Sequence, residues 1–431
     1  MHYYSTNRKS NPVDFKTATV LGQAPDKGLY YPEAIPNISQ WQKKSLADWS
    51  KNELAFRVIR PYAGNCMSDD KLFEIVSDTI NFDFPLVPVS DKIYSLELFH
   101  GPTLAFKDVG ARFMSRCLAH FNEGNTRKIT VLVATSGDTG GAVANGFENV
   151  EGVEVIILYP SGKVSPVQEL QLTTCAENIT ALEVAGSFDD CQAIVKQAFT
   201  DADLQSSYQL TSANSINVAR WLPQQLYYFF ALQQWQNDKA PVISVPSGNF
   251  GNICAGMIAQ RSGLDVHHFI AACNANDTIP GYMSSGLMKE KNSVPTISNA
   301  MDVAKPSNFV RILEMYDLDL HWLRTALSSV SINDDITKET IAHSLHQYHY
   351  LTDPHGAVAL FALEQYLEQH PGEKGIFLET AHPIKFPEVV EAITKQSIDV
   401  PENIAPLFTK EKRSIGMNAS FDSFKEWMLN R

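Results

Sequence analysis

Paired cysteines and long apolar runs are both missing from this chain. Its six cysteines are far apart and form no Cys-x-x-Cys pair, so neither a zinc site nor a disulfide framework is indicated. No stretch approaches the roughly 18 apolar residues of a membrane-spanning helix, and residues 1–11 are polar and charged where a secretory signal would be apolar. We therefore expect a cytoplasmic protein with reduced thiols.

Basic residues are also in short supply. The chain has 35 Lys and Arg against 48 Asp and Glu, which gives a formal charge of −13 and a pI near 5.4. Nucleic acids and anionic membranes bind to basic surfaces, so we expect neither as a partner. A small anionic molecule is compatible with this charge where a local pocket reverses the field. Composition leaves open whether the chain is a monomer or a small homo-oligomer.

Several familiar ligand motifs are absent as well. No Gly-Lys-Ser/Thr follows a glycine loop, and neither a Gly-x-Gly-x-x-Gly nor a His-Glu-x-x-His pattern occurs. His343, His346 and His349 recur every three residues, a step that drifts around a helix, and His267 and His268 are merely adjacent. We interpret these histidines as solvated and expect no bound metal.

The length and apolar content suffice for more than one hydrophobic core. With 431 residues, of which 44% are hydrophobic, the chain corresponds to two or three domains. From residue 128 onward short apolar runs alternate with longer amphipathic stretches, which predicts βαβ units around a mostly parallel sheet. We expect strands at residues 129–134, 153–159, 242–245 and 376–378. The first 95 residues lack this alternation and are interpreted as a separate N-terminal domain.

The loop at residues 247–252, Ser-Gly-Asn-Phe-Gly-Asn, lies between an apolar strand and a helix-like stretch. Glycine and asparagine tolerate positive φ, so successive backbone N–H groups there can point inward at the positive end of a helix. Such a nest cradles a phosphate without a charged side chain. When the loop is considered alone, an ordinary tight turn accounts for it equally well.

A single lysine, Lys107, follows the apolar residues Leu104, Ala105 and Phe106. An apolar setting favours the neutral amine, which is the form that condenses with an aldehyde. Lys107 is therefore a candidate Schiff-base lysine. The commoner meaning of a lysine beside an aspartate is a solvated surface pair, here Lys107 with Asp108.

Two further loops offer hydroxyls, amides and a cation. Residues 135–140 follow the first predicted strand, where they can hold a carboxylate or simply cap the next helix. Asn214 or Ser215 is expected to cap a long helix that runs to Trp235, with Arg220 about one and a half turns into it. A second anion site there would suit a phosphorylated substrate, although a capped helix with a surface arginine needs no ligand.

Together these segments resemble the threonine synthases, which have the tryptophan-synthase-β type of pyridoxal-phosphate fold. The resemblance extends from residues 24–32 through the loops above to residues 380–383, and spacing and order agree throughout. Joint occurrence of so many segments is far more specific than any one loop. The resemblance implies an α/β enzyme of fold type II, with two open parallel-sheet lobes and an N-terminal domain. The implied boundaries are 1–95 for the N-terminal domain, 96–112 with 213–431 for a large cofactor-binding lobe, and 113–212 for a smaller mobile lobe.

The resemblance also implies roles for individual residues. Lys107 matches the lysine that holds pyridoxal 5'-phosphate as a Schiff base, and Thr380 matches the hydroxyl residue facing the pyridine nitrogen. The other cofactor-binding matches are the phosphate-loop residues Gly248, Asn249, Phe250, Gly251 and Asn252. The substrate-binding matches are Ser136, Asp138 and Thr139 near the substrate carboxylate and ring edge, and Asn214, Ser215 and Arg220 around the substrate phosphate.

The activity that this resemblance implies is a β,γ-elimination and replacement on O-phospho-L-homoserine. Water enters, L-threonine and phosphate leave, and Lys107 is the catalytic base. One alternative of the same fold is a serine or threonine dehydratase, which has no need for the anion site at residues 214–220. Another is a phospho-lyase that converts the same substrate into 2-oxobutyrate. A catalytically silent relative would be free to lose Lys107, the phosphate loop and Thr380.

Overall fold

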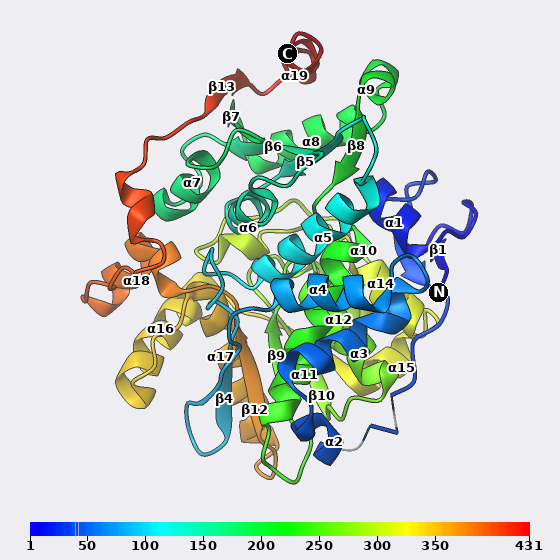
Figure 1. Ribbon diagram of the computed structural model, residues 1–431. Coiled ribbons are helices and arrows are strands. Elements are labelled where there is room, and N and C mark those ends of the chain that lie inside the picture. Colours follow the sequence, from blue (N-terminus) through cyan, green and yellow to red (C-terminus); the bar gives the residue numbers. More distant parts are fainter. Residues whose placement is uncertain (39, 42) are drawn as a thin grey trace.

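Two parallel sheets occupy opposite ends of the molecule (Figure 1) in this computed structural model, which describes residues 1–38, 40–41 and 43–431. The five-stranded sheet has the order β13-β7-β6-β5-β8 and is parallel throughout. Its strands are β5 (Ile129–Ala134), β6 (Val153–Pro160), β7 (Ile179–Ala185), β8 (Gln209–Ser212) and β13 (Ile415–Asn418). Among the described residues, no helix is long and apolar enough to cross a membrane.

The six-stranded sheet has the order β11-β10-β9-β12-β4-β3 and is parallel except for the edge strand β3. Its strands are β3 (Leu86–Pro88), β4 (Ile93–Glu97), β9 (Val242–Pro246), β10 (His268–Cys273), β11 (Leu327–Ser331) and β12 (Gly375–Glu379). Strands β5, β9 and β12 are buried at every residue, as expected where helices cover both faces of a parallel sheet. The predicted strands and the α/β fold with two parallel sheets are thereby confirmed.

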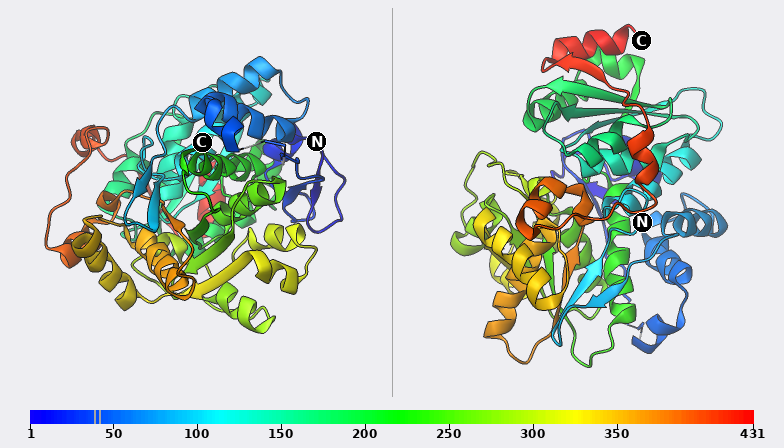
Figure 2. Two further views of the ribbon diagram at one scale, coloured as in Figure 1. Left: turned by 90° about the horizontal axis from the view of Figure 1, so that it is seen from below. Right: turned by 90° about the vertical axis from the view of Figure 1, so that its left-hand side faces the viewer.

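Helices cover both faces of the five-stranded sheet. Those formed by the neighbouring sequence are α6 (Asp138–Phe147), α7 (Pro166–Thr173), α8 (Phe188–Ala198) and α9 (Ala202–Ser207). The C-terminal helix α19 (Phe421–Leu429) joins them, because Phe424 and Met428 are fully buried in the same cluster as Cys191 of α8. Residues 415–429 therefore pack on the five-stranded sheet, whereas we expected the chain from 213 to 431 to lie in the larger lobe. The chain that leads back to this sheet runs along one side of the molecule (Figure 2) and is mostly exposed.

The helices around the six-stranded sheet come mostly from the second half of the chain. They are α10 (Val218–Trp221), α11 (Gln225–Gln234), α12 (Gly251–Ser262), α13 (Thr278–Ser285), α14 (Phe309–Met315), α15 (Leu320–Ala326), α16 (Asp334–Tyr348), α17 (Pro354–Gln369) and α18 (Pro387–Thr394), with short 3-10 turns η1 (Leu222–Gln224), η2 (Asn299–Met301) and η3 (Pro383–Lys385). A further 3-10 turn, η4 (Ala405–Thr409), packs in an apolar cluster with Val167 of α7. The long helix predicted up to Trp235 is thus divided into α10, η1 and α11. Pro223 lies at the division, where its missing N–H and fixed φ interrupt an α-helix.

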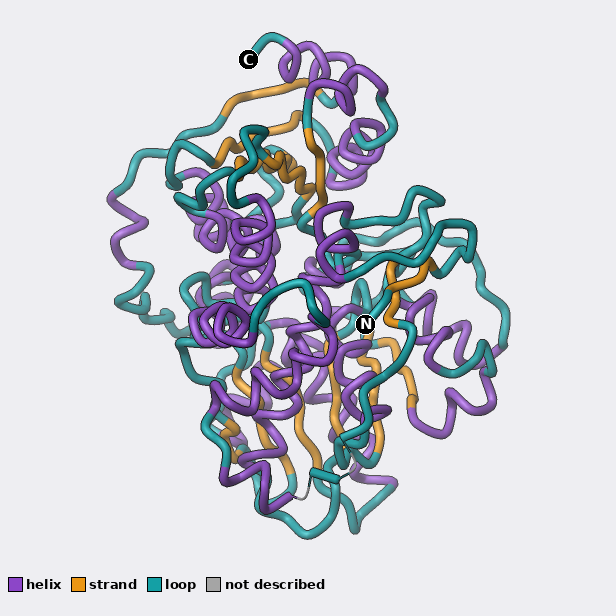
Figure 3. Tube along the Cα trace, turned by 45° about the vertical axis from the view of Figure 1, so that its right-hand side comes forward, coloured by secondary structure: helices purple, strands orange, loops and turns teal. Residues whose placement is uncertain are grey.

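The N-terminal segment packs on the main core. It contains the antiparallel pair β1 (Tyr3–Ser5) and β2 (Tyr30–Pro32) and the helices α1 (Phe15–Leu21), α2 (Lys43–Asp48), α3 (Lys51–Ala63) and α4 (Asp69–Thr79). Leu54 and Val58 of α3 belong to the same apolar cluster as Phe229 of α11, and Gln233 donates to the carbonyl of Trp49 at 2.8 Å. Helix α5 (Lys107–Asn122) also contributes to this cluster. The strands form two groups with helices between and around them (Figure 3).

Candidate functional site

A cavity of about 1410 Å³ contains every residue that the sequence assigned to the site. It is lined by the loops that follow β5, β8, β9 and β12, so the carboxyl ends of strands from both sheets contribute to it. The predicted residues in its wall are Lys107, Ser136, Asp138, Thr139, Asn214, Ser215, Arg220, Gly248, Asn249, Phe250, Gly251, Asn252 and Thr380.

Lys107 is placed by a backbone pairing between two distant segments. Phe106 N–H donates to the carbonyl of Thr380 at 2.9 Å, His382 N–H donates to that of Leu104 at 3.0 Å, and Ala105 forms a bridge with Ala381. Leu104 adopts a positive φ of 58°, which turns the chain from this pairing into α5. Lys107 is the first residue of that helix, so its side chain shares the cavity wall with Thr380.

The electrostatic setting of Lys107 favours a neutral amine. Burial lowers its pKa to about 8, the charge of Asp138 opposes this shift, and the charges of Lys385 and Arg220 add to it. Asp108 is not its surface partner, because the Asp108 carboxylate is buried and accepts from Thr103 N–H at 2.9 Å and Thr103 Oγ1 at 2.5 Å. The solvated-pair interpretation of Lys107 and Asp108 is therefore wrong.

The phosphate-loop candidate opens α12 and leaves its backbone donors available. Phe250 has the positive φ, 61°, whereas Gly248, Asn249 and Asn252 do not. Among the described residues, no acceptor is recorded for the N–H groups of residues 248–252. The side chain of Asn252 holds the loop in place, because its Nδ2 donates to the carbonyl of Pro246 at 2.8 Å. A helix N-terminus with several unpaired donors is a favourable anion site.

Gly248 is required by a close approach of two backbone segments. A Cβ on Gly248 would lie 2.5 Å from Met301 Cα, so the loop rests directly on η2. That turn is held by His355, whose Nε2 accepts from Ala300 N–H at 3.1 Å while its Nδ1 is 2.5 Å from Asp353 Oδ2. The structure thus corrects the reason for the glycine, since the prediction relied on positive φ.

The segment at residues 214–220 supplies side chains from the other wall. Asn217, and not Asn214 or Ser215, caps α10, with its Oδ1 accepting from Ala219 N–H at 3.0 Å. Ser215 Oγ instead accepts from Asn249 Nδ2 at 2.8 Å, and Asn214 Nδ2 donates to the carbonyl of Ala134 at 3.2 Å. The predicted cap was wrong, but its residues are tied to the phosphate loop and to the end of β5.

Arg220 is a buried cation that forms no ion pair with any residue that the structure describes. Only 3% of its surface is exposed, and within the described part of the chain its Nε and Nη1 have no hydrogen-bond partner and its guanidinium no carboxylate partner. Burial lowers its pKa to about 10, which leaves it charged at neutral pH. Because an unpaired buried charge is expensive, the arrangement is suited to an anionic ligand in the cavity.

Arg311 of α14 organises this wall, although the sequence analysis did not find it. Its guanidinium donates to the carbonyls of Tyr30 at 3.0 Å, Ser215 at 3.1 Å and Ile216 at 2.6 Å, and it lies over the ring of Trp221. The residue is fully buried. An arginine in a short amphipathic stretch gives no sequence signal that distinguishes it from a surface residue.

Asp138 is held by two side chains that the sequence analysis also missed. Its Oδ1 lies 2.8 Å from Lys385 Nζ and accepts from Gln168 Nε2 at 2.9 Å. The loop before it is folded by Thr135, whose Oγ1 accepts from the N–H groups of Gly137 at 2.9 Å and Gly140 at 2.8 Å. Residues 135–140 are therefore both a capped helix start and part of the cavity wall.

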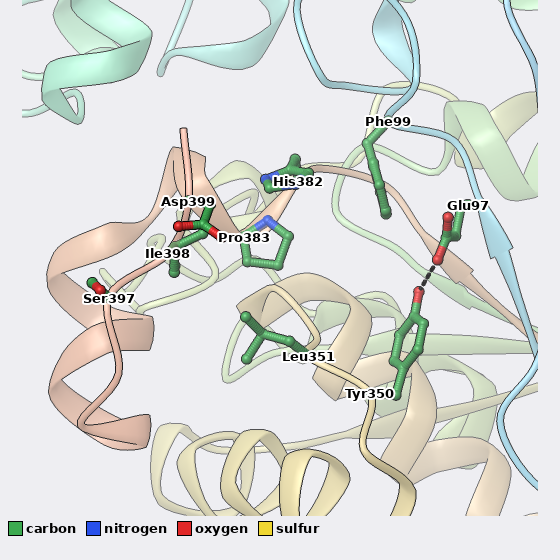
Figure 4. A pocket seen from close by; sticks show the side chains of 9 residues that line it. All are labelled: Glu97, Phe99, Tyr350, Leu351, His382, Pro383, Ser397, Ile398 and Asp399. Carbon is green, nitrogen blue, oxygen red and sulfur yellow. Dashed lines mark hydrogen bonds between the residues drawn. The ribbon is translucent and has the colours of Figure 1, made fainter. Parts of the chain in front are cut away.

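A second, smaller cavity of about 320 Å³ lies beside the segment that carries Thr380. Glu97 Oε1 accepts there from Tyr350 Oη at 2.9 Å, and His382 and Asp399 face the same hollow (Figure 4). Burial lowers the pKa of His382 to about 4, so this imidazole is neutral at physiological pH. Across the described residues, no group of three or more His, Cys, Asp or Glu is arranged to hold a metal.

Comparisons with known proteins agree with one another along the whole chain. Residues 86–378 match the family model described as pyridoxal-phosphate dependent enzyme, residues 2–80 the model for the threonine synthase N terminus, and residues 356–428 the model for the threonine synthase C-terminal region. A threonine synthase of Haemophilus influenzae is 41% identical over 436 residues, covering all of both chains.

Two solved structures extend this similarity to the fold. The crystal structure of threonine synthase from Escherichia coli superimposes with a TM-score of 0.93 at 39% identity, and all of both chains is covered. A structure of threonine synthase from Brucella melitensis with bound pyridoxal phosphate superimposes with a TM-score of 0.92 at 33% identity, covering 100% of this chain and 99% of the other.

Proposed function

We propose that this chain, which belongs to the threonine synthase family of pyridoxal-phosphate-dependent enzymes, converts O-phospho-L-homoserine and water into L-threonine and phosphate. The observation that carries the proposal is the buried, unpaired guanidinium of Arg220 in the same cavity as Lys107. A substrate with both an amine and a phosphate would place its amine near Lys107 and its phosphate against the Arg220 guanidinium.

The residues present fit pyridoxal 5'-phosphate. The unpaired N–H groups of residues 248–252 suit its phosphate, Lys107 with its lowered pKa suits its aldehyde, and the Thr380 hydroxyl suits the pyridine nitrogen. When bound, this group supplies an electron sink that acidifies the substrate Cα–H. A neutral hydroxyl opposite the ring nitrogen makes that sink milder than a carboxylate would.

The chain's own residues account for the other requirements of the reaction. Lys107 Nζ, on the cavity wall, is the base that takes the proton from substrate Cα and returns a proton during turnover. Arg220, Asn214 and Ser215 hold the γ-phosphate before it leaves and retain it afterwards. The retained phosphate is then positioned to accept a proton from the water that adds at Cβ.

Closure of the cavity is part of the proposal. Water must be excluded from the cavity until phosphate has left, and one water molecule must then be admitted to add at Cβ. The cavity wall is built from both sheets, so a rotation of the smaller lobe, residues 113–212, toward the larger one would seal it. The division that we propose begins the larger lobe at residue 86 and not at 96, because β3 and β4 belong to its six-stranded sheet. Residues 86–112 and most of 213–431 then form the larger lobe and residues 1–85 the N-terminal domain. The C-terminal residues 415–429 would move with the smaller lobe, since they pack on its sheet.

Product analysis on O-phospho-L-homoserine tests the proposal. Wild-type protein should release threonine and phosphate in equal amounts with little 2-oxobutyrate, and should use L-serine, L-threonine and L-homoserine poorly. Arg220→Ala should lower kcat/KM for the phosphorylated substrate on the order of 10- to 100-fold, because a charge-assisted contact is lost. Arg57→Ala, on the exposed face of α3, is the matched control.

Two outcomes would favour the alternatives. Efficient turnover of L-serine or L-threonine that is indifferent to Arg220→Ala would identify a dehydratase. Release of 2-oxobutyrate as the main product from O-phospho-L-homoserine would identify a phospho-lyase.

A further inference from the structure

The buried ion pair between Asp138 and Lys385 lies where the two sheets' loops meet. Asp138 begins α6 of the five-stranded sheet, and Lys385 ends η3, which follows β12 of the six-stranded sheet. Lys385 is 0% exposed and Asp138 4% exposed, and their Nζ and Oδ1 atoms are 2.8 Å apart. Lys385 also donates to the carbonyl of Thr103 at 2.9 Å, in the loop that leads to Lys107.

Further ionisable side chains lie near this pair. Asp108 of α5 is a buried carboxyl that Lys385 attracts, although burial raises its pKa, and the imidazole of His382 is also close enough to feel the charge of Lys385. Asp138 faces Lys385 from η3, Lys107 from α5 and the neutral amide of Gln168 from α7. Burial by itself would raise the pKa of Asp138, but the charges of Lys385 and Lys107 outweigh it and hold that pKa well below its usual value. The carboxyl is therefore ionised. Asp138 lines the cavity, whereas Lys385 lies behind it.

An ionised aspartate in this position conflicts with the expected ligand. The resemblance to the threonine synthases assigns Ser136, Asp138 and Thr139 to the substrate carboxylate and the ring edge, and all three line the cavity. Only Ser136 and Thr139 have hydroxyls that can donate to a carboxylate. Two carboxylates side by side in a buried site repel each other strongly unless a cation compensates one of them. A buried ion pair often contributes no net stability to the fold, so stability does not explain why a lysine is fully buried here. A role in ligand binding does explain it.

We propose that Lys385 is a positioning residue of the carboxylate subsite, which neutralises Asp138 so that an α-carboxylate can bind beside Ser136 and Thr139. The inference rests on the proposed function, because the proposed substrate is an amino acid with an α-carboxylate. The inference predicts that amino acids bind better than the corresponding amines. It attributes this preference to Lys385, which lies outside the cavity wall.

The test compares ligands that differ only in the carboxylate. L-Serine and ethanolamine are titrated into the holoenzyme, and binding is measured from the change in cofactor absorbance. Wild-type protein should bind L-serine at least about tenfold more tightly than ethanolamine. Lys385→Met should weaken L-serine binding on the order of 100-fold, because the remaining partner of a buried pair is left uncompensated, and should change ethanolamine binding little.

Two further variants separate charge compensation from structural damage. Lys385→Met combined with Asp138→Asn should restore L-serine binding to within about tenfold of wild type, since both charges are then removed. Asp138→Asn alone should prefer L-serine over ethanolamine at least as strongly as wild type does, because the repelling carboxylate is removed. A contact of Asp138 that both ligands share would weaken both alike and leave this preference unchanged. Lys374→Met, at a half-buried lysine just before β12, is the matched control.

Three results would overturn the inference. They are equal weakening of L-serine and ethanolamine in Lys385→Met, no recovery in the double variant, and a fall of tenfold or more in the preference for L-serine over ethanolamine in Asp138→Asn. The result for Asp138→Asn tests the role of Lys385 even if the Lys385→Met protein does not fold. Absence of turnover of O-phospho-L-homoserine in wild type would refute the proposed function instead, while the two titrations would still decide the role of Lys385.

Discussion

Gly248→Ala is expected to loosen the binding of pyridoxal phosphate through a steric conflict under the phosphate loop. The added Cβ would lie 2.5 Å from Met301 Cα and 3.2 Å from both the carbonyl oxygen of Ala300 and Met301 C. Carbon atoms in contact are normally about 3.5–4.0 Å apart, so the loop and η2 must separate by about 1 Å. The atoms in the way belong to the backbone, which cannot rotate aside.

The size of the effect follows from this overlap. Overpacking a well-packed site by one carbon costs about 1–3 kcal/mol, which corresponds to a rise in the cofactor dissociation constant of about 5- to 150-fold. The matched control is Gly251→Ala in the same loop. Its Cβ would be 3.3 Å from Asn308 Nδ2 and from Ser215 Cβ, so a shift of a few tenths of an ångström relieves it. We expect Gly251→Ala to change the dissociation constant by less than about threefold.

The measurement is a titration of cofactor-free protein with pyridoxal phosphate, followed by absorbance, together with thermal unfolding of each variant. A lower unfolding temperature with unchanged cofactor affinity would mean that the overlap is absorbed elsewhere in the core. Gly248→Ala protein that binds the cofactor as tightly as Gly251→Ala protein would refute the idea that η2 supports the phosphate loop.

Three other predictions follow from the same cavity. Lys107→Ala should abolish both the yellow colour of the holoenzyme and the borohydride-trapped adduct, and Lys196→Ala, at the exposed rim, should abolish neither. The pKa of Lys107 is lowered to about 8, so the rate at which the cofactor-free protein captures pyridoxal phosphate should rise with pH and level off above about pH 8. A rate that keeps rising toward pH 10.5 would show that the pKa of this lysine is not lowered. Arg311→Met should lower the free energy of urea unfolding by about 2–4 kcal/mol, because buried carbonyls of Tyr30, Ser215 and Ile216 lose their donor; a change below about 0.5 kcal/mol would contradict that account.

The strands that carry the site could be predicted because they are buried on both faces. Residues 129–134 form β5 with the predicted bounds. The predicted strands are one residue shorter than β6 and β9 at the C-terminal end, and one residue shorter than β12 at each end. The C-terminal strand β13 could not be predicted. Its sequence, Ile-Gly-Met-Asn, is short and mostly exposed, so it has neither the length nor the apolar run of a buried strand.

The site residues could be predicted from the sequences of the loops, but the interactions that position these residues could not. Gly248, Lys107 and Arg220 were found because each is an unusual residue in its local context. The partnership of Asp138 with Lys385 joins segments that are distant in the sequence, and no local pattern contains it. The cap at Asn217 was missed because Asn214, Ser215 and Asn217 are all good capping residues, and only tertiary contacts decide between them.

The return of β13 to the five-stranded sheet has a mechanical consequence. That sheet is joined to the rest of the protein by three covalent tethers, namely α5, the segment after β8, and the chain between η3 and β13. In the closure that we propose, three separate attachments would limit translation of this sheet and would leave a rotation about an axis near them. Cutting the chain between residues 400 and 412 removes one tether, and no residue in that range lines either cavity. It should therefore widen this rotation and increase the access of water to Lys107, while the residues that bind the ligands stay in place.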